Sequence, residues 1–299
     1  MKLVTYMVED SVPRLGVISR DTEWVFPLKP VGIEYKSMLE LIRGVGDSEL
    51  QLIDYTSVQD PIKVKEAAQI SEVRFLPPIP EPEQDIICLG LNYRAHAKES
   101  AEFKKETFDV VKEQKAVYFS KRANRMTTSG DPLPAHADIV KQLDYECELA
   151  VIIRKDADHI RPEDVKDCIF GYSIINDVSA RDLQSAHGQW FFGKSLDGFS
   201  PMANCILTAD SVIYPPELGI RSYINGELRQ DSNTKFLIHS IDEIISELSQ
   251  GMVLRSGTII ATGTPAGVGM GFKPPKFLKP GDEVTCEIDG IGKLTNVVQ

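Results

Sequence analysis

Two glutamates separated by one residue form the most informative acidic pair of the sequence. Glu146 and Glu148 lie in the run DYECELAVII, which has the length and apolar composition of a β-strand. Side chains alternate between the faces of a strand, so these carboxylates share one face. Two like charges directed toward an interior are unfavourable unless a cation joins them. Oxygen ligands are typical of Mg²⁺, Mn²⁺ or Ca²⁺ sites rather than zinc sites. A solvent-facing pair on an edge strand is the alternative.

A third acid, Asp177, ends a near-continuous apolar run that begins at Cys168. A carboxylate at the end of a strand can project over the sheet and supply a third oxygen ligand. It could equally cap the helix that follows. Three acids around an octahedral Mg²⁺ would leave about three positions for water or a chelating substrate, which is a catalytic arrangement.

His96 and Glu99 form a second cluster with chemical potential. On a helix, residues three apart share a face, and this spacing suits a histidine base oriented by a carboxylate. The alternative is an ordinary surface ion pair.

Two further segments offer groups for an anion. Lys194 lies among aromatic residues and glycines in WFFGKSLDG, where it either extends its ammonium to solvent or is held in a pocket. The segment ATGTPAGVG, residues 261–269, follows an apolar run and offers backbone amides and hydroxyls. A plain turn is the rival interpretation of the second segment.

The elements that must position these residues are mostly strands. Apolar runs of strand length, punctuated by Gly, Pro, Asp and Asn, occur at 2–7, 15–18, 24–28, 85–89, 116–119, 147–153, 168–175, 212–214, 257–261 and 283–288. Helical periodicity occurs over 35–42, 179–187 and 239–250. The pattern predicts a strand-rich α+β protein rather than a doubly wound α/β sheet.

A proline-rich stretch divides the chain. Four prolines fall within Pro77 to Pro82, where the chain can neither continue a helix nor sit inside a sheet. We therefore predict a small N-terminal α+β domain over residues 1–75, a linker over 76–83 and a larger domain over 84–299.

Composition limits the partners and the location. The 299 residues include 33 Lys and Arg against 44 Asp and Glu, a formal charge of −11, so nucleic acid and anionic membranes are not expected partners. No secretory signal is apparent at the N-terminus. Five scattered cysteines indicate reduced, buried thiols in a cytoplasmic protein. The sequence has no Walker A loop, G-x-S-x-G elbow or Cys-x-x-Cys pair, and no two histidines at helical spacing with an intervening glutamate. These absences argue against nucleotide binding by that loop, a serine hydrolase and a zinc protease.

Five ordered motifs resemble those of the fumarylacetoacetate hydrolase family. They are G-x-N-Y-x-x-H-x-x-E at 90–99, Y-E-x-E-L-A at 145–150, N-D-x-[ST]-A-R-D-x-Q at 176–184, the Gly-Lys-Ser around Lys194, and T-G-T-P-x-G-V-G at 262–269. The resemblance runs from about residue 80 to the C-terminus. It implies a catalytic domain built as a β-roll or sandwich, assembled as a homodimer.

The resemblance also implies roles for individual residues. It implies Mg²⁺ or Mn²⁺ on Glu146, Glu148 and Asp177, and a base dyad of His96 and Glu99 on a mobile lid. The stretch 99–115, rich in Lys and Glu and poor in core residues, suits such a lid. It places Lys194 among the catalytic groups. The residues that would contact substrate are Lys121, Arg181, Gln184 and Thr264.

Members of this family act on 2-oxo acids, and several reactions follow from that resemblance. The favoured one is hydrolysis of an acylpyruvate, a 2,4-dioxo acid, through a metal-stabilised pyruvate enolate, with the dyad activating water. An oxaloacetate-type decarboxylase and a hydroxydienoate isomerase are alternatives on the same site. A non-catalytic 2-oxo-acid sensor is an alternative of a different class.

Overall fold

The computed structural model describes residues 1–9, 12–104 and 115–299. The helices are α1 (Met38–Gly44), α2 (Asp47–Ser57), α3 (Arg94–Lys104), α4 (Arg181–Ala186), α5 (Phe191–Lys194) and α6 (Ile241–Ser249). The N-terminal strands are β1 (Lys2–Met7), β2 (Arg14–Ile18), β3 (Trp24–Pro27), β4 (Ala68–Gln69) and β5 (Arg74–Leu76). The later strands are β6 (Ile86–Gly90), β7 (Val117–Lys121), β8 (Pro132–Leu133), β9 (Leu143–Asp144), β10 (Cys147–Ile153), β11 (Ile169–Asn176), β12 (Ser179–Ala180), β13 (Cys205–Thr208), β14 (Gly219–Ile224), β15 (Glu227–Asn233), β16 (Ile259–Ala261), β17 (Glu283–Ile288) and β18 (Gly292–Val298).

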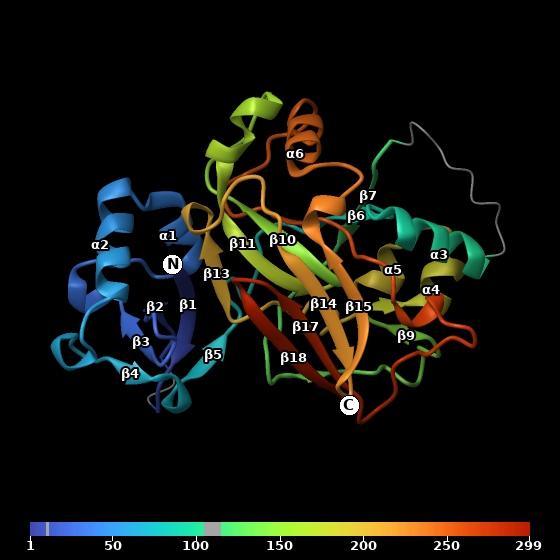
Figure 1. Cartoon of the computed structure of the whole chain (residues 1–299), viewed down its shortest axis with the longest axis horizontal. Helices are drawn as coiled ribbons and strands as arrows, with labels where there is room; N and C mark the ends of the chain where they lie inside the picture. Colours follow the sequence, from blue (N-terminus) through green and yellow to red (C-terminus); the bar gives the residue numbers. More distant parts are fainter. Residues whose placement is uncertain (10–11, 105–114) are drawn as a thin grey trace.

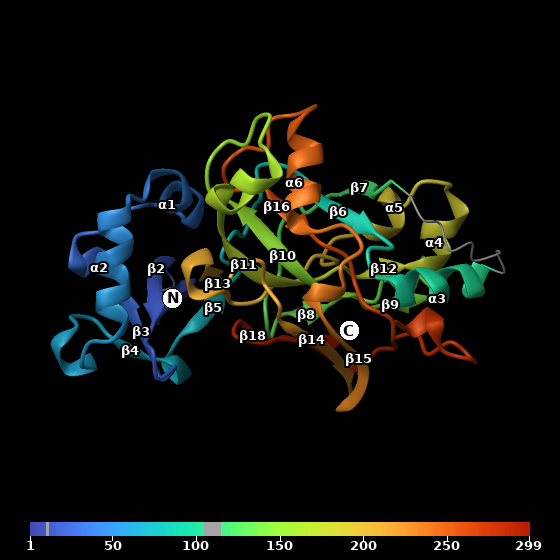
Figure 2. The same ribbon diagram turned by 45° about the horizontal axis from the view of Figure 1, so that its top comes forward.

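The strands form one large sheet, a five-stranded sheet and a short pair. The large sheet has the order β4-β3-β2-β1-β13-β11-β10-β16-β6-β7, and β5 joins it beside β1. The second sheet has the order β15-β14-β17-β18-β8, and β12 pairs with β9. In Figures 1 and 2, α3, α4 and α5 gather at one end of the molecule, beside β9 and β12. The prediction of a strand-rich α+β fold is confirmed.

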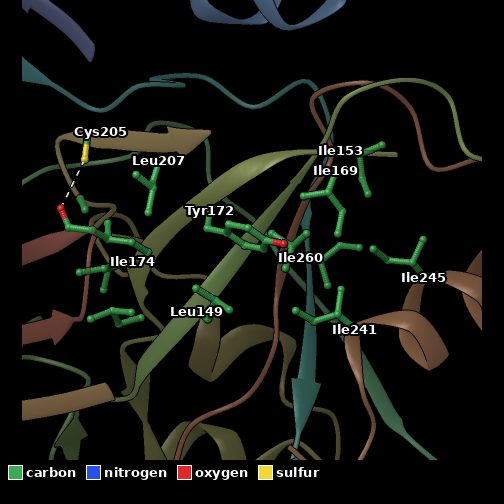
Figure 3. Close-up of a cluster of buried hydrophobic side chains, with 14 of the residues drawn as sticks. Leu149, Ile153, Ile169, Tyr172, Ile174, Cys205, Leu207, Ile241, Ile245 and Ile260 are labelled. Carbon is green, nitrogen blue, oxygen red and sulfur yellow. Dashed lines mark hydrogen bonds between the residues drawn. The ribbon is translucent and has the colours of Figure 1, made fainter. Parts of the chain in front are cut away.

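Strand β10 divides the core into two layers because its side chains alternate. Leu149, Val151 and Ile153 belong to a buried cluster that also includes residues of the five-stranded sheet and of α6 (Figure 3). Ala150 and Ile152, on the other face, pack in a cluster with residues of the N-terminal segment. The strand predicted over 147–153 is observed with these bounds as β10. All of its residues are buried because both of its faces are largely apolar, which is typical of a central strand.

Helix α6 shows how sequence signals position an element. Ser240 accepts a hydrogen bond from the Glu243 N–H (3.2 Å) and Glu243 accepts one from the Ser240 N–H (2.8 Å), which forms a capping box at the start of the helix. The buried residues of α6, at the spacing seen in the sequence, face the large core cluster and include Ile241, Ile244 and Ile245.

The N-terminal segment shares the large sheet with the rest of the chain. Strand β1 pairs antiparallel with β13, with Lys2 opposite Leu207. Strand β5 begins at Arg74 and ends at the edge of the proline-rich stretch. The division into domains at 76–83 therefore stays a prediction.

Some sequence-based boundaries were wrong. Residues 212–214 do not form a strand, because Ile213 is 91% exposed and the prolines at 215 and 216 lack the N–H donors that a ladder needs. The helix expected from residue 35 begins at Met38, where the Ser37 hydroxyl accepts a hydrogen bond from the Glu40 N–H.

None of the helices in the described ranges is long and apolar enough to cross a membrane. All five cysteines are buried free thiols, as the sequence predicted. The cytoplasmic location stays a prediction, and so does the homodimer.

Candidate active site

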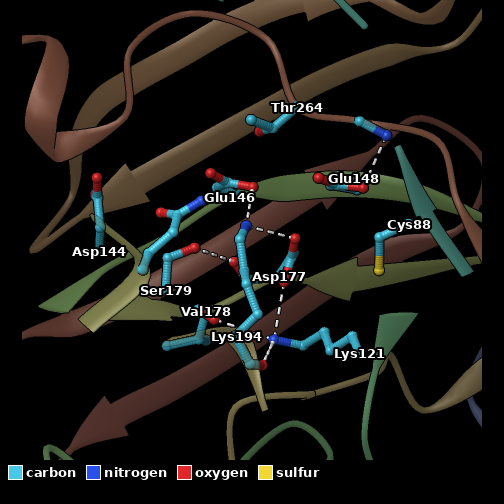
Figure 4. A network of polar contacts seen from close by, with 12 residues as sticks. Cys88, Lys121, Asp144, Glu146, Glu148, Asp177, Val178, Ser179, Lys194 and Thr264 are labelled. Carbon is cyan, nitrogen blue, oxygen red and sulfur yellow. Dashed lines mark hydrogen bonds and ion pairs between the residues drawn. The ribbon is translucent and has the colours of Figure 1, made fainter. Parts of the chain in front are cut away.

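Adjacent antiparallel strands bring the three acids together. Cys147 of β10 lies opposite Asn176 of β11, so Glu146 precedes one strand where Asp177 follows the other, and the Asp177 N–H donates to the Glu146 carbonyl (2.8 Å). Glu146, Glu148 and Asp177 are at most 5% exposed. One carboxylate oxygen of each lies within 4.8 Å of those of the other two (Figure 4). The acids expected from strand alternation therefore do converge, and they are buried rather than solvent-facing.

The three carboxylates fit a hard divalent cation. Glu148 Oε2 accepts a hydrogen bond from the Gly263 N–H (2.8 Å), whereas the buried Oε1 has no hydrogen-bond partner within the described parts of the chain. Burial, with repulsion from Asp177 and Glu146, raises the pKa of Glu148 well above its usual value. A cation among these oxygens would offset the repulsion and supply the missing partner. Oxygen-only donors suit Mg²⁺ or Mn²⁺.

Lys194 lies directly beside this acid cluster. Its Nζ donates to Glu146 Oε2 (2.7 Å) and to Asp177 Oδ2 (2.6 Å), so it bridges two of the three acids (Figure 4). Burial disfavours the charged form, but Asp177 and Glu146 outweigh it and raise the pKa of the Lys194 ammonium. Of the two interpretations of Lys194, the structure supports a cation held in a pocket.

Lys121 lies beneath Asp177 rather than in the open part of the site. Its fully buried Nζ contacts Asp177 Oδ1 (2.8 Å) and donates to the carbonyls of Val178 (3.0 Å) and Lys194. Burial lowers the pKa of the Lys121 ammonium. This placement favours a role in holding Asp177 over direct contact with substrate.

Arg181 begins α4 and is fixed by two acids. Its Nε donates to Asp144 Oδ2 (2.9 Å), and Nη1 pairs with Glu146 Oε1 (2.6 Å) and donates to Gln184 Oε1 (3.2 Å). Burial is outweighed by Glu146 and Asp144, which raise the pKa of the guanidinium. The buried Nη2 has no hydrogen-bond partner among the described residues, and Arg181 lines the cavity described below.

Asp144 was not singled out by the sequence reasoning. It is fully buried, and besides Arg181 it accepts hydrogen bonds from the N–H groups of Gly269 (2.6 Å) and Met270 (3.0 Å). Its position directly before Tyr145 and Glu146 is the feature of the sequence that could have indicated a place in the site.

The His96 and Glu99 side chains meet on α3, as the spacing predicted. His96 Nδ1 lies 3.4 Å from Glu99 Oε2, and both Glu99 oxygens accept from the Gly267 N–H (2.9 and 3.2 Å). His96 is only 4% exposed, which disfavours a surface ion pair. Residues 105–114, the greater part of the predicted lid, lie outside the described residues.

The 262–269 segment packs tightly against the site. Thr264 donates to the Cys147 carbonyl (2.9 Å) and accepts from Gln230 Nε2 (2.7 Å). Gln230, which is fully buried on β15, also accepts from the Cys147 N–H (3.1 Å) and was missed from the sequence. Gly267 has a φ of +105°, and a Cβ there would lie 1.9 Å from the Arg229 carbonyl oxygen, so only glycine fits.

A cavity of about 490 Å³ opens over these groups. Its polar lining includes the predicted site residues His96, Glu146, Arg181, Gln184, Lys194 and Thr264. Glu148, Asp177 and Lys121 do not line it and lie buried beside this lining. The structure thus gathers a general-base candidate, two cations and an acid cluster around one hollow. The roles of these residues stay predictions.

The chain matches characterised proteins over most of its length. It is 46% identical over 229 residues to oxaloacetate tautomerase YisK of Bacillus subtilis, which covers 77% of this chain and 74% of that protein. The structure of fumarylacetoacetate hydrolase from Exiguobacterium antarcticum is 39% identical, with a TM-score of 0.84 and coverage of 100% and 99%. That of maleylpyruvate hydrolase from Sphingobium sp. SYK-6, with manganese(II) and pyruvate, is 28% identical, with a TM-score of 0.76 and coverage of 100% and 98%.

The sequence model described as "Fumarylacetoacetate (FAA) hydrolase C-terminal" matches residues 85–299, which include every candidate site residue. This match and the relatives agree with the resemblance carried by the five motifs. The chain belongs to the fumarylacetoacetate hydrolase family.

Proposed function

We propose that this protein is a divalent-metal-dependent enzyme that transfers a proton at the carbon next to the carbonyl group of a small 2-oxo acid. The observation that carries the proposal is the placement of His96, oriented by Glu99, in the same cavity wall as Glu146 of the acid cluster. The Bacillus subtilis relative, named as an oxaloacetate tautomerase, supports proton transfer.

Electrostatics support an anionic substrate. The buried acids Asp144, Glu146, Glu148 and Asp177 outnumber the buried cations Lys121, Arg181 and Lys194 by one. A divalent ion held by Glu146, Glu148 and Asp177 would reverse the sign of this balance, and it would supply Lewis acidity that polarises the 2-oxo carbonyl. Arg181, which lines the cavity, is then the donor for the substrate carboxylate.

The proton is handled by His96. In the tautomer that donates Nδ1–H to Glu99, Nε2 carries the lone pair that takes a proton from substrate carbon and returns it. Glu99 is held in turn by the Gly267 N–H, which fixes the ring orientation. Lys194, bridging Glu146 and Asp177, keeps these acids in place and adds positive charge where the enolate oxygen develops.

Hydrolysis of an acylpyruvate is the second candidate. The Sphingobium neighbour is named as a maleylpyruvate hydrolase, and a His96–Glu99 dyad can activate water as well as move a proton. In this reaction His96 Nε2 takes the proton of a water whose oxygen bonds to the distal carbonyl carbon. The bond between that carbon and C3 breaks, and the proton passes to C3, so the products are pyruvate and a carboxylic acid.

The test follows proton exchange and cleavage separately. The protein is incubated with Mn²⁺ or with chelator in deuterated buffer, with oxaloacetate or acetylpyruvate, and C3 deuteration, pyruvate, acetate and CO2 are measured. Metal-dependent deuteration that His96→Gln slows on the order of 10²-fold or more supports the proposal. The matched control is His159→Gln, at an exposed histidine paired with Asp158. Cleavage to pyruvate and acetate would favour the second candidate, and deuteration unaffected by His96→Gln would remove the base from the mechanism.

A further inference from the structure

The cavity has a second, apolar wall that the proposed chemistry does not use. The charged groups and His96 form one part of the lining. The rest includes the apolar side chains of Leu89, Leu91, Phe103, Phe119, Trp190 and Met270. A 2-oxo-acid head would occupy the charged part, so this wall faces whatever the substrate carries beyond it.

Size points the same way. A cavity of about 490 Å³ lies within the range of roughly 300–1,000 Å³ that is typical of sites for larger organic ligands. A four-carbon acid occupies only on the order of 100 Å³, judged from about 30 Å³ for each water in the liquid. A small acid alone would leave most of the apolar wall in contact with water.

The wall has a built geometry rather than a chance collection of side chains. The Trp190 ring packs edge-on against Phe119, with centroids 5.2 Å apart at 72°. Gly90 makes room for the indole, because a Cβ at this position would lie 2.3 Å from Trp190 Cζ3. The glycine of the first motif thus allows the aromatic ring to lie over the end of β6.

Charge disfavours a distal carboxylate. Among the described lining residues the cationic side chains are Arg181 and Lys194, and both are already engaged with buried acids. Arg181, as a lining residue, can serve one carboxylate, which is that of the 2-oxo-acid head. The other polar side chains of the lining, which include Ser100, Gln184 and Ser185, carry no charge, so a second carboxylate over the apolar wall would be desolvated without a cationic partner.

We infer that the site selects 2-oxo acids whose distal group is apolar, with an aryl or alkyl substituent seated against Trp190 and Phe119. This inference rests on the proposed function for the identity of the head group. It differs from the oxaloacetate named for the Bacillus subtilis relative, whose distal group is a carboxylate.

Binding tests the inference independently of turnover. Calorimetry of the Mn²⁺-loaded protein compares phenylpyruvate, oxaloacetate and oxalate, the last representing the head alone. We expect phenylpyruvate to bind about 10-fold more tightly than oxaloacetate, since burial of a ring is worth roughly that factor or more. Trp190→Ala should reduce the preference to about 2-fold while oxalate affinity changes little, and Trp190→Phe should restore most of it.

Two further variants sharpen the result. Gly90→Ala, which forces the indole to move, should weaken phenylpyruvate but not oxalate binding. Phe236→Ala, at an aromatic residue that is 60% exposed and outside the cavity lining, should change none of the affinities. Equal or tighter binding of oxaloacetate, or a preference that survives Trp190→Ala, would overturn the inference. If the apolar preference is absent but oxaloacetate is turned over, the inference fails and the proposed function stands. If phenylpyruvate binds selectively but no 2-oxo acid is turned over, the proposed function fails and the apolar site stands.

Discussion

Replacement of Glu148 by glutamine separates metal binding from folding. The Glu148→Gln variant keeps a side-chain oxygen that can accept the Gly263 N–H hydrogen bond, so the local fold is retained. It removes one of the three carboxylates that lie within 4.8 Å of one another. Because the three acids are buried, a bound divalent ion should stabilise the wild-type fold, and the variant should lose most of that stabilisation.

The magnitude follows from linkage. An ion at about 100 times its Kd adds about 2.7 kcal/mol to the free energy of unfolding. Mutation of a residue that only hydrogen-bonds to a metal ligand typically weakens metal binding by about 10- to 100-fold. Loss of a direct ligand should therefore weaken Mn²⁺ binding by at least about 100-fold. At the same Mn²⁺ concentration the variant then gains only about 0.4 kcal/mol. The difference of about 2.3 kcal/mol corresponds to about 4 °C in Tm for a chain of this size.

Scanning calorimetry with Mn²⁺ and with chelator measures these shifts. Glu163→Gln, at a glutamate side chain that is 64% exposed, is the matched control and should keep the full Mn²⁺ shift. A wild-type protein with no Mn²⁺ shift, or a Glu148→Gln variant with an undiminished one, would refute the assignment of these acids to a metal site.

Two other predictions concern the fold that holds the site. Leu149→Ala should lower the free energy of unfolding by about 2–5 kcal/mol, since Leu149 is fully buried in the core cluster. Urea denaturation measures this change. Leu228→Ala, at a half-exposed leucine, is the control and should have little effect on the free energy of unfolding. Gly267→Ala should lower both stability and kcat/KM, because its Cβ would meet the Arg229 carbonyl at a φ that L residues disfavour. Gly251→Ala, where a Cβ meets nothing within 4 Å, is the control, and equal effects of both glycine variants would contradict the packing argument.

Local regularities account for the part of the site that was predictable. Alternation along one strand is a property of the backbone, so Glu146 and Glu148 had to share a face once the run DYECELAVII, residues 144–153, was taken as a strand. The spacing of His96 and Glu99 likewise sufficed to place them together on a helix.

Residues whose partners are distant in sequence were not predictable in the same way. Asp144 contacts the N–H of Gly269, 125 residues later, and Gln230 contacts Thr264 and the backbone of Cys147 from a different sheet. No periodicity links such positions. Lys121 was expected to contact substrate. Whether a lysine lines a cavity or is buried beside it depends on the tertiary packing around it, and here the fully buried ammonium contacts Asp177 and does not line the cavity.

Local pattern and residue order were sufficient to predict the strand-rich fold, the shared face of Glu146 and Glu148, and the family. The three-dimensional packing was needed to show that Asp177 joins that pair, that Arg181 lines the cavity beside it, and that Trp190 completes an apolar wall. Each of these depends on distances between segments far apart in the chain, which only the packing of sheets and helices brings about.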